Sequence, residues 1–414
     1  MRVAFARLAL LLFAALACAP RQPALVPATA STAAPVQLVE SSPVETNLDH
    51  ADIPNAKDVW LSMIAGASGS LDFAEFYASN EPGSSLEAVI QAIEAAADRG
   101  VNVRFLAEDK FYKTYPQTLD RLAGRTGIQV RRYRVAELMG GVLHAKYFIA
   151  DGREAFLGSQ NFDWRSLEHI QELGVELRVR SVVNALSDVF ETDWALAGGA
   201  SRERRVRSHV AENRFPAVVE GLGQPLRITP VFSPRGWLPD ESLWDLPRLV
   251  EMIDSARSRI RVQLLTYRAR DDGGTVIFPE LESALRRAAD RGVAVELLAA
   301  DWSKRKGIIE GLQRLQSPPA ITVKLVEIPQ WSGGRIPFAR VIHAKYLVVD
   351  GERCWIGTSN WEKDYFFKSR NVGVIIESAG FAGRLARFFE DDWNSKYAVA
   401  VDPSAKYEPP HYGE

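Results

Sequence analysis

The sequence predicts an α/β protein of two tandem repeats, each a β-sheet flanked by helices, packed about a pseudo-two-fold axis with one shared site. Two observations carry this prediction. The order helix, strand, helix, strand occurs twice along the 414 residues. A block of polar residues is also repeated at a constant offset of 199 positions (343 − 144), from its histidine to its last asparagine. Core packing alone would preserve apolar spacing, not a shared spacing of polar side chains.

The first repeat is predicted over residues 51–200. Its expected elements are a helix over 59–64, a strand over 70–77, a helix over 85–99 and a strand over 101–107. Gly100 follows the second helix, at a place where glycine commonly ends one. Alternation of helices with strands is typical of layered α/β structures.

The second repeat is predicted over residues 226–400, followed by a tail over 401–414. Its expected elements are a helix over 246–256, a strand over 260–265, a helix over 278–291 and a strand over 293–299. Residues 287–293 match residues 95–101 almost one for one. Between the repeats, the polar stretch 201–225 is interpreted as a solvated connector. A phosphate-facing patch is the alternative for its arginines, Arg202, Arg204, Arg205 and Arg207.

The N-terminus has the features of an export signal. Arg2 and Arg7 precede a short apolar run, which predicts a signal peptide over residues 1–17 rather than a membrane span. The bond before Cys18 is also the one cut in bacterial lipoproteins, so lipid attachment at Cys18 is expected, with simple secretion as the alternative. Residues 18–50, rich in Ala, Pro and Thr, are predicted to form a disordered tether. We therefore expect an exported protein: a bacterial cell envelope lipoprotein of the periplasm or outer membrane, otherwise a secreted protein.

Composition limits the partners and cofactors. The formal net charge is −2, so no global field draws in nucleic acid or anionic lipid, and any attraction for phosphate must be local. The chain has six His and two Cys, and no spacing among them suits a metal site, so neither a metal nor a cofactor is expected. With Cys18 lipidated, Cys354 has no disulfide partner and is expected to be a small buried residue.

The repeated block reads as a β-hairpin in each half. The first copy is His144-Ala-Lys146, Asp151 and Gly158-Ser-Gln-Asn161; the second is His343-Ala-Lys345, Asp350 and Gly357-Thr-Ser-Asn360. Asp-Gly is a two-residue turn signal, which predicts that facing residues sum to 303 in the first hairpin and 701 in the second. This register places His144 opposite Ser159 and His343 opposite Thr358. Alternation groups Lys146 and Asn161 with His144, and likewise Lys345 and Asn360 with His343.

Each hairpin thus offers an imidazole, an ammonium, a hydroxyl and an amide on one face, a set that suits a phosphodiester. Lys and Asn donate to non-bridging oxygens, and Ser159 and Thr358 are expected to support the phosphate. A His near its usual pKa can attack phosphorus or deliver a proton. A covalent displacement needs one of each, and two hairpins meeting at a pseudo-two-fold axis supply both. Asp151 and Asp350 are interpreted as turn-forming scaffold acids.

A carboxylate distinguishes the two halves. Glu172 follows His144 by 28 residues (172 − 144) and is a candidate to orient it, whereas the position 199 later is Asn371. A carboxylate fixes the tautomer of an imidazole and stabilises the imidazolium. This asymmetry favours His144 as the nucleophile and His343 as the general acid.

At these residues the chain resembles the phospholipase D superfamily, whose signature is His-x-Lys-x4-Asp followed by Gly-Ser/Thr-x-Asn. Both copies match without a gap, and the resemblance extends over about residues 53 to 400. Segments 157–167, 339–346 and 355–366 are similar to the branch of lysosomal phospholipase-D-like exonucleases and poxvirus relatives. The resemblance implies a metal-independent phosphodiesterase with a phosphohistidine intermediate. It implies that the active residues are His144, Lys146, Asn161, His343, Lys345 and Asn360, with Glu172 as supporting acid.

The substrate remains open at this point. Single-stranded nucleic acid is the expectation for this branch, and phospholipids of the envelope are the alternative. A third hypothesis is a non-catalytic envelope binding protein, although no motif His or Lys is missing. Aromatic residues near the second block could stack bases or pack the core: Trp331, Trp361, Tyr365, Phe366 and Phe367. Basic runs at 131–134 and 304–306 could contact phosphates or simply be solvated. Because both half-sites lie in one chain, a monomer is expected.

Overall fold

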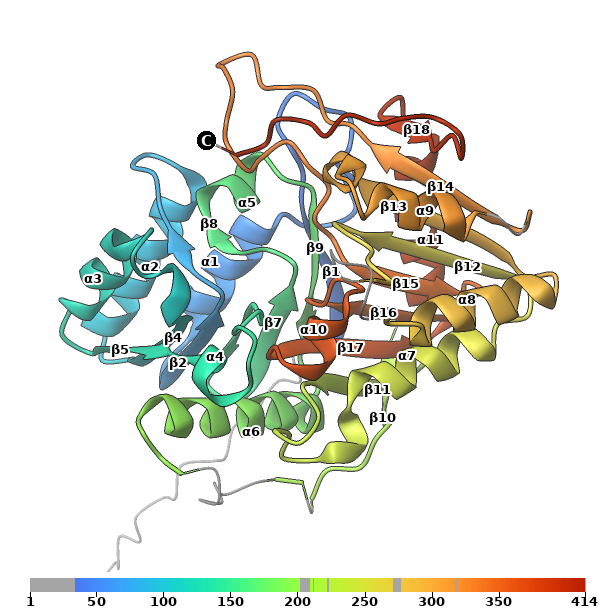
Figure 1. Ribbon diagram of the computed structural model, residues 1–414. Coiled ribbons are helices and arrows are strands. Elements are labelled where there is room, and N and C mark those ends of the chain that lie inside the picture. The colour runs from blue at the N-terminus through green and yellow to red at the C-terminus, as the bar shows by residue number, and fades with distance from the viewer. Residues whose placement is uncertain are drawn as a thin grey trace, which may run out of the picture. The chain divides into compact units, whose positions relative to one another are not determined.

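Two mixed β-sheets form the scaffold of the protein in this computed structural model (Figure 1). The structure describes residues 34–201, 209–210, 212–221, 223–270, 277–316 and 319–413. From Ala34 onward these residues belong to one compact unit. The predicted signal peptide, Cys18 and the connector arginines at 202–207 lie outside the described residues.

The first sheet has seven strands, and its last three are parallel neighbours. In spatial order they are β1 (Val36–Ser41), β9 (Glu172–Leu177), β7 (Glu154–Gly158), β6 (Tyr147–Ala150), β2 (Ser70–Glu75), β4 (Asn102–Glu108) and β5 (Ile128–Tyr133). The short strands β3 (Ala78–Ser79) and β8 (Phe162–Asp163) pair separately. The predicted strands at 70–77 and 101–107 are β2 and β4 of this sheet.

The second sheet repeats the strand order of the first and adds a strand at each edge. In spatial order it comprises β10 (Ala217–Gly221), β11 (Gln224–Ser233), β17 (Asn371–Glu377), β16 (Arg353–Gly357), β15 (Tyr346–Val349), β12 (Arg259–Leu264), β13 (Ala294–Ala300), β14 (Ile321–Val326) and β18 (Ala398–Ala400). The run from β17 to β14 corresponds strand by strand to the run from β9 to β5. The α/β class and the two tandem repeats are therefore confirmed.

Helices cover the outer face of each sheet (Figure 1). In the first repeat these are α1 (Ala56–Gly66), α2 (Ser85–Asp98) and α3 (Pro116–Ala123), and in the second α7 (Asp245–Asp254), α8 (Glu280–Asp290) and α9 (Ile309–Leu315). The remaining helices are α4 (Val135–Leu138), α5 (Trp164–Glu168), α6 (Arg180–Ala197), α10 (Lys363–Phe367) and α11 (Ala379–Asn394). Among the described residues, no helix has both the length and the apolar character needed to cross a membrane.

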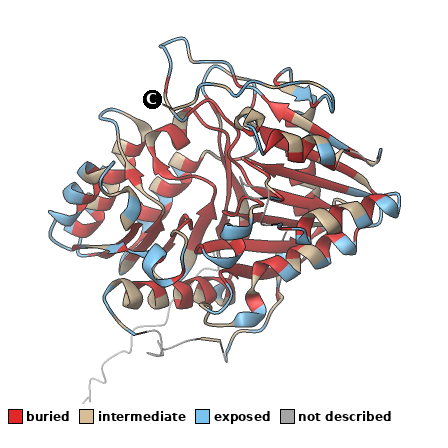
Figure 2. Ribbon diagram, in the orientation of Figure 1, coloured by how far each residue is buried: buried red, intermediate tan, exposed pale blue. Residues whose placement is uncertain are grey.

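Strand alternation divides the apolar residues among three cores. In β6, Tyr147 and Ile149 join the central core that both repeats share, whereas Phe148 faces the first repeat's own core. In β15, Tyr346 joins the central core and Leu347 the second repeat's core. Because both faces are covered, the strands are buried along most of their length (Figure 2). The shared core holds the two repeats together and brings their hairpins to one junction.

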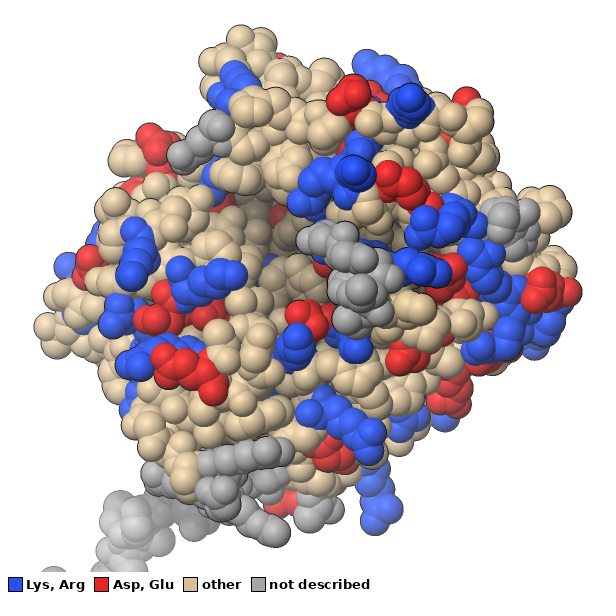
Figure 3. Space-filling model, in the orientation of Figure 1, with Lys and Arg blue, Asp and Glu red and all other residues tan. Residues whose placement is uncertain are grey.

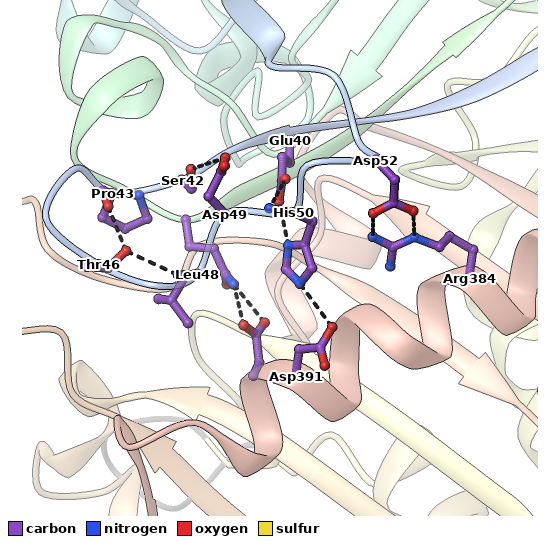
Figure 4. Close-up of polar contacts among 12 residues, drawn as sticks. Glu40, Ser42, Pro43, Thr46, Leu48, Asp49, His50, Asp52, Arg384 and Asp391 are labelled. Carbon is purple, nitrogen blue, oxygen red and sulfur yellow. Dashed lines mark hydrogen bonds and ion pairs between the residues drawn. The ribbon is translucent and has the colours of Figure 1, made fainter.

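The prediction of a disordered tether over 18–50 is wrong for its last part. Residues 36–41 form β1, which pairs antiparallel with β9. The loop after it is fixed by His50, whose ring Nδ1 bonds Glu40 at 2.9 Å and whose Nε2 lies 3.4 Å from Asp391 of α11 (Figure 4). Glu40 is fully buried, so its bonds to His50 fix the loop against β1, and the contact of His50 with Asp391 links this segment to the second repeat. The strand was not predicted because the high content of Ala, Pro and Thr in this stretch outweighed the alternating pattern Val-Gln-Leu-Val.

The connector prediction also needs correction. Residues 217–221 form β10, and 224–225 already belong to β11, so a hairpin occupies the end of the stretch that was expected to be solvated. The buried member of β10 is Ala217, while Val218 is 59% exposed. An edge strand with one open face has few apolar residues, which is why its sequence resembles a connector.

The hairpin register differs by one residue from the prediction. Tyr147 pairs with Leu157 and Tyr346 with Ile356, so facing residues sum to 304 and 702. The turns have three residues, since Asp151 and Gly152 both have positive φ (53° and 61°) and Arg153 N bonds Ala150 O at 3.0 Å. The ladder starts only at Tyr147 and Tyr346. Each motif His and Lys therefore precedes its strand.

Candidate active site

The two histidines are held by backbone bonds to the opposite repeat. His144 N donates to Arg370 O at 2.9 Å, and His343 N donates to Gln171 O at 2.8 Å. The two bonds are equivalent, because 144 + 199 = 343 and 171 + 199 = 370. Isolated bridges from Leu143 to Arg370 and from Gln171 to Ile342 repeat the same relation. The junction therefore has two-fold pseudo-symmetry, as the sequence predicted, with one histidine from each repeat.

Paired glycines let the strands beside each histidine approach closely. Gly158 pairs with Gly174, and Gly357 with Gly373. A Cβ on Gly158 would lie 2.7 Å from the Gly174 Cα, which is closer than side chains tolerate. The glycine that opens each Gly-Ser/Thr-x-Asn motif thus serves the sheet, and places the following residues at the junction.

Glu172 contacts His343 and not His144, which corrects the predicted pairing. Its Oε2 lies 2.8 Å from Nδ1 of His343, and Ser166 Oγ donates to its Oε1 at 3.0 Å. Burial raises the pKa of Glu172 to about 8, although Lys345 acts in the opposite direction. The carboxylate crosses to the other repeat because β9 enters the junction beside the second hairpin, and no spacing within one repeat could show this.

His144 receives an amide in the equivalent position. Its Nδ1 lies 3.1 Å from Asn371 Oδ1, which also accepts from Thr358 Oγ1 at 3.0 Å. The amide nitrogen of Asn371 donates to Tyr365 O at 2.8 Å, so its oxygen is the atom that faces His144. Nδ1 of His144 must therefore carry the hydrogen, which leaves the lone pair on Nε2. Burial and the charges of Lys146 and Lys345 hold the pKa of His144 well below its ordinary value.

The two motif lysines are buried at the same junction. Lys146 Nζ donates to His144 O at 2.7 Å, and Lys345 Nζ donates to His343 O. Burial lowers the pKa of Lys345 to about 7, with Glu172 opposing the shift. The pKa of Lys146 is also lowered, by burial and then by the charge of Lys345. An anion bound between two buried ammonium groups stabilises the charge of both.

Asn161 and Asn360 also reach the junction, each beside a tyrosine. Asn161 Nδ2 donates to Tyr77 Oη, and Asn360 Nδ2 to Tyr365 Oη, both at 3.4 Å. Oδ1 of Asn161 is buried and has no hydrogen-bond partner among the described residues. The two amides thus retain capacity for a further polar group.

Ser159 and Thr358 lie beneath the junction, and their support of the phosphate stays a prediction. Both are fully buried. Ser159 Oγ exchanges hydrogen bonds with the backbone of Leu173 (3.0 and 3.2 Å), and Thr358 Oγ1 does so with Val372 (3.2 and 3.3 Å). With the register shifted by one residue, both hydroxyls bond the neighbouring strand, and each also acts on a residue of the site: Thr358 donates to Asn371, and Ser159 lowers the pKa of Glu172.

Asp151 and Asp350 lie at the far end of the hairpins from the histidines. Asp151 accepts from the backbone N–H of Gly69 and Ser70 at 2.7 and 2.8 Å. Asp350 accepts likewise from Ser258 at 2.8 Å and Arg259 at 3.0 Å. These bonds lower the pKa of Asp151 to about 2, against the effect of burial. Each aspartate ties its hairpin turn to the start of the neighbouring strand.

The aromatic residues at the site are mostly not those singled out from the sequence. Trp361 and Phe366 are fully buried in the second repeat's core, and Phe367 packs against Trp244. Trp331 packs against His169. Of the predicted set, Tyr365 contacts a motif histidine, with its ring 4.7 Å from that of His144.

Sequence reasoning missed the segment that follows β2. The ring of Phe76 lies 4.8 Å from that of His144, and Glu75, the buried last residue of β2, lies near enough to Lys146 for that charge to act on its carboxyl group. Burial raises the pKa of Glu75 well above its usual range. These residues continue the C-terminal end of a parallel strand, where α/β proteins commonly place sites, and that signal was available in the sequence.

Two buried carboxylates brace the junction from behind. Asp193 of α6 forms a bidentate ion pair with Arg370 (2.8 and 2.9 Å), and both side chains are fully buried. At the equivalent positions, Asp392 of α11 accepts two bonds of 2.7 Å from Gln171. Burial raises the pKa of Asp392 to about 7. Arg370 and Gln171 are also the residues whose carbonyls hold His144 and His343.

The assembled groups can bind and attack an anionic ester. Two imidazoles, two ammonium groups and two amides converge at a junction that Figure 3 shows as a hollow near the centre of one face, with Lys and Arg side chains along its right side. Among the described residues, no cluster of three or more His, Cys, Asp or Glu side chains is placed to hold a metal ion. The imidazoles, ammonium groups and amides of this junction can supply a nucleophile, an acid and cationic binding groups.

Known proteins share this arrangement. The family described as "Cardiolipin synthase, PLD-like domain" matches residues 60–194 and 249–393. The chain is 32% identical over 398 residues to the human 5′-3′ exonuclease PLD3, across 89% of this chain and 81% of that protein. It is 29% identical over 386 residues to phospholipase D Z of Dictyostelium discoideum, across 88% and 90%. The phosphatidylserine synthase of Haemophilus influenzae has the same fold, with a TM-score of 0.59, 12% identity and 85% of each chain covered.

The fold, the two half-sites and the family match define a phosphodiesterase of the phospholipase D superfamily, and the chain belongs to that superfamily. Within it, the chain falls in the branch of the PLD3 and PLD4 exonucleases; the mouse 5′-3′ exonuclease PLD4 is 30% identical over 404 residues, across 88% of this chain and 79% of that protein. The resemblance expected from the paired His-x-Lys motifs is confirmed.

Proposed function

We propose that the protein is a metal-independent exonuclease that hydrolyses phosphodiester bonds of single-stranded nucleic acid through a phosphohistidine. The observation that carries the proposal is the pair of imidazoles at one junction, each fixed through Nδ1 by a residue of the opposite repeat. The identity to exonucleases of the PLD3 and PLD4 branch over most of the chain favours nucleic acid over lipid.

His144 is proposed as the nucleophile and His343 as the general acid, the order predicted from the sequence but for a different reason. Glu172 and His343 titrate as a unit: burial lowers the pKa of His343 and raises that of Glu172 to about 8, so at neutral pH the unit holds its proton on the carboxyl group. Nδ1 of His343 can take up that proton as the hydrogen on its Nε2 passes to a leaving oxygen. His144 has only an amide partner and a lowered pKa, so its Nε2 lone pair is available for attack.

The reaction then proceeds in two displacements. Nε2 of His144 bonds to phosphorus, the phosphorus–oxygen bond of the leaving strand breaks, and its oxygen takes the proton of His343. In the second step His343 accepts a proton from water, the water oxygen bonds to phosphorus, and the nitrogen–phosphorus bond breaks. Lys146, Lys345 and the two asparagines bind the non-bridging oxygens, where charge accumulates.

The direct test uses the soluble chain from residue 34 with EDTA present, on single-stranded DNA, single-stranded RNA and phosphatidyl lipids. Stepwise release of nucleotides, lost in His144→Asn and His343→Asn, is the expected result. Release of lipid headgroups without cleavage of either nucleic acid would replace the nuclease by a phospholipase. Binding without turnover would favour an envelope binding protein, and a requirement for a divalent ion would contradict the mechanism.

The dependence of activity on pH should reflect the titration of Glu172 and His343. Activity is expected to fall as pH rises through about 7 to 8, where Lys345 loses its charge and the unit loses its acidic proton. Glu172→Gln should lower kcat/KM at pH 6.5 by about 10²-fold and move the alkaline limb to lower pH. Glu176→Gln, on the same strand and paired with Arg178, is the matched control. An unmoved limb in Glu172→Gln would contradict the assignment of the acid.

We further propose that the chain is exported and attached to the bacterial envelope through a lipid on Cys18, the alternative being secretion as a monomer. The basic and apolar pattern of residues 1–18 supports this proposal. Cys18→Ala should abolish incorporation of labelled palmitate and release the protein from membranes in a fractionation assay. Equal labelling of the variant and the parent protein would contradict lipid attachment.

A further inference from the structure

The rim of the site on the first repeat is made of aromatic rings. Phe76 and Tyr77 follow β2, and Phe111 and Tyr115 follow β4. The rings of Phe76 and Phe111 are 4.5 Å apart, and those of Tyr77 and Tyr115 stack at 5.2 Å. All four side chains are partly exposed. Partly exposed rings in mutual contact form a surface on which a flat ring can stack.

This aromatic rim, defined as Phe76, Tyr77, Phe111 and Tyr115, reaches the catalytic groups. Phe76 lies 4.8 Å from His144, ring to ring, and Nζ of Lys146 lies 4.8 Å from the Phe76 centroid. Tyr77 Oη accepts from Asn161 at 3.4 Å. A group bound on the rim is therefore next to the phosphate-binding side chains.

The second repeat has no such rings at the corresponding places. Leu71 and Ile260 occupy the same register in their sheets, an offset of 189 (260 − 71), and Val103 and Val295 give an offset of 192 (295 − 103). These offsets equate Phe76, Tyr77, Phe111 and Tyr115 with Leu265, Thr266, Ser303 and Gly307. The pseudo-symmetry of the catalytic groups is thus broken at the rim.

The second repeat presents cations instead. A cavity of about 370 Å³ is lined by Arg268, Arg270, Lys363 and Lys368, together with Glu362 and Asp364. Glu362 lies 3.7 Å from Arg268 and accepts from Thr266 at 2.5 Å, which ties the cavity to the Asn360 side of the site. Among the described residues, Arg270 and Lys363 have no acidic partner. We call the cavity lined by these six residues and Phe278 the cationic cavity.

The cationic cavity adjoins the catalytic junction through Tyr365. This tyrosine belongs to α10, the helix that carries Lys363 and Asp364, and its ring lies 4.7 Å from that of His144. The charges of Arg268 and Arg305 both act on the Tyr365 hydroxyl. The aromatic rim and the cationic cavity therefore flank the same pair of histidines.

We propose that the aromatic rim stacks the terminal nucleobase of the strand and that the cationic cavity binds the phosphates of the nucleotides beyond the scissile bond. The inference rests on the proposed nuclease function and assigns the two ends of the substrate to the two repeats. Stacking of bases on aromatic side chains tolerates any sequence, and a cationic groove follows the backbone. A strand bound in this way enters in one direction only, which a symmetric site could not impose.

The test compares single-stranded DNA ending in thymidine with the same strand ending in an abasic nucleotide. The parent protein should prefer the thymidine end. Phe111→Ala and Tyr115→Ala should each lower kcat/KM for the thymidine end about tenfold more than kcat/KM for the abasic end, through KM. Tyr112→Ala is the matched control, because its hydroxyl bonds Asp120 outside the rim. Phe111→Trp should retain the preference.

The cationic cavity is tested with strands of two and ten nucleotides. Arg270→Ala and Lys363→Ala should reduce the advantage of the longer strand and lower the salt dependence of KM, whereas Arg248→Ala on the exposed side of α7 should do neither. If the parent protein cleaves DNA but treats thymidine and abasic ends equally, the inference fails and the nuclease stands. If it cleaves no nucleic acid, the proposed function itself fails.

Discussion

Replacing His144 by Asn is expected to lower kcat/KM for single-stranded DNA by at least about 10⁴-fold, the largest effect of any single substitution in this protein. The substitution removes the proposed nucleophile, the imidazole whose Nε2 carries a lone pair. His343→Asn should lower the same parameter by about 10² to 10⁴-fold, because it removes an acid and leaves the nucleophile intact. Quenched-flow measurements on a labelled oligonucleotide give both values.

The rates of the two variants should differ on a substrate whose leaving group needs no proton. On the p-nitrophenyl ester of thymidine 5′-phosphate, His343→Asn is expected to recover most of the rate of the first displacement, seen as a burst of nitrophenolate. His144→Asn should show no burst on either substrate. Recovery in His144→Asn instead would reverse the two roles, and would agree with Glu172 supporting a cationic phosphohistidine on His343.

Acid quenching provides an independent check on the same assignment. A phosphohistidine at position 144 is expected in the parent protein and should accumulate in His343→Asn, where the second step lacks its base. A peptide modified at 343 would overturn the order. Lys396→Gln changes an exposed lysine that contacts the ring of Tyr397, and it serves as the control for non-specific loss of phosphohistidine.

The second large effect concerns stability. Arg370→Met is expected to lower the free energy of unfolding by about 3 to 5 kcal/mol, because it leaves the fully buried carboxylate of Asp193 without its partner. Burial already raises the pKa of Asp193, and Arg370 opposes that shift. Without the arginine, the folded-state pKa rises further above the unfolded value. Folding then favours the protonated form, so the loss should be larger at pH 8 than at pH 5.

Urea unfolding at the two pH values measures this prediction. The pseudo-symmetric variant Gln171→Met should cost less near pH 5, because Asp392, with a pKa of about 7, is already protonated there. Arg227→Met, at an exposed ion pair on β11, should change stability by less than about 0.5 kcal/mol. A loss for Arg370→Met no larger than that for Arg227→Met would show that the buried pair does not brace the junction.

Much of the fold was predictable because apolar periodicity and duplication are local signals. The predicted helices and strands of both repeats occur where expected, apart from end residues. The errors share a cause. β1 and β10 lie in segments whose composition is polar or rich in Ala and Pro, and their pairing with β9 and β11 is a property of the sheet. The register error arose because the Asp-Gly turn holds a third residue once Asp151 binds the start of β2.

The candidate site divides in the same way. The spacing of 199 residues determined by itself that His144, Lys146 and Asn161 belong with His343, Lys345 and Asn360 in one junction. Only the tertiary structure decided that Glu172 contacts His343, that Ser159 and Thr358 bond the backbone of neighbouring strands, and that Phe76 and Tyr77 of the first repeat and Tyr365 of the second lie beside the site. A repeat records which residues are equivalent. It does not record which repeat a side chain reaches, because that depends on how two sheets pack and not on distance along the chain.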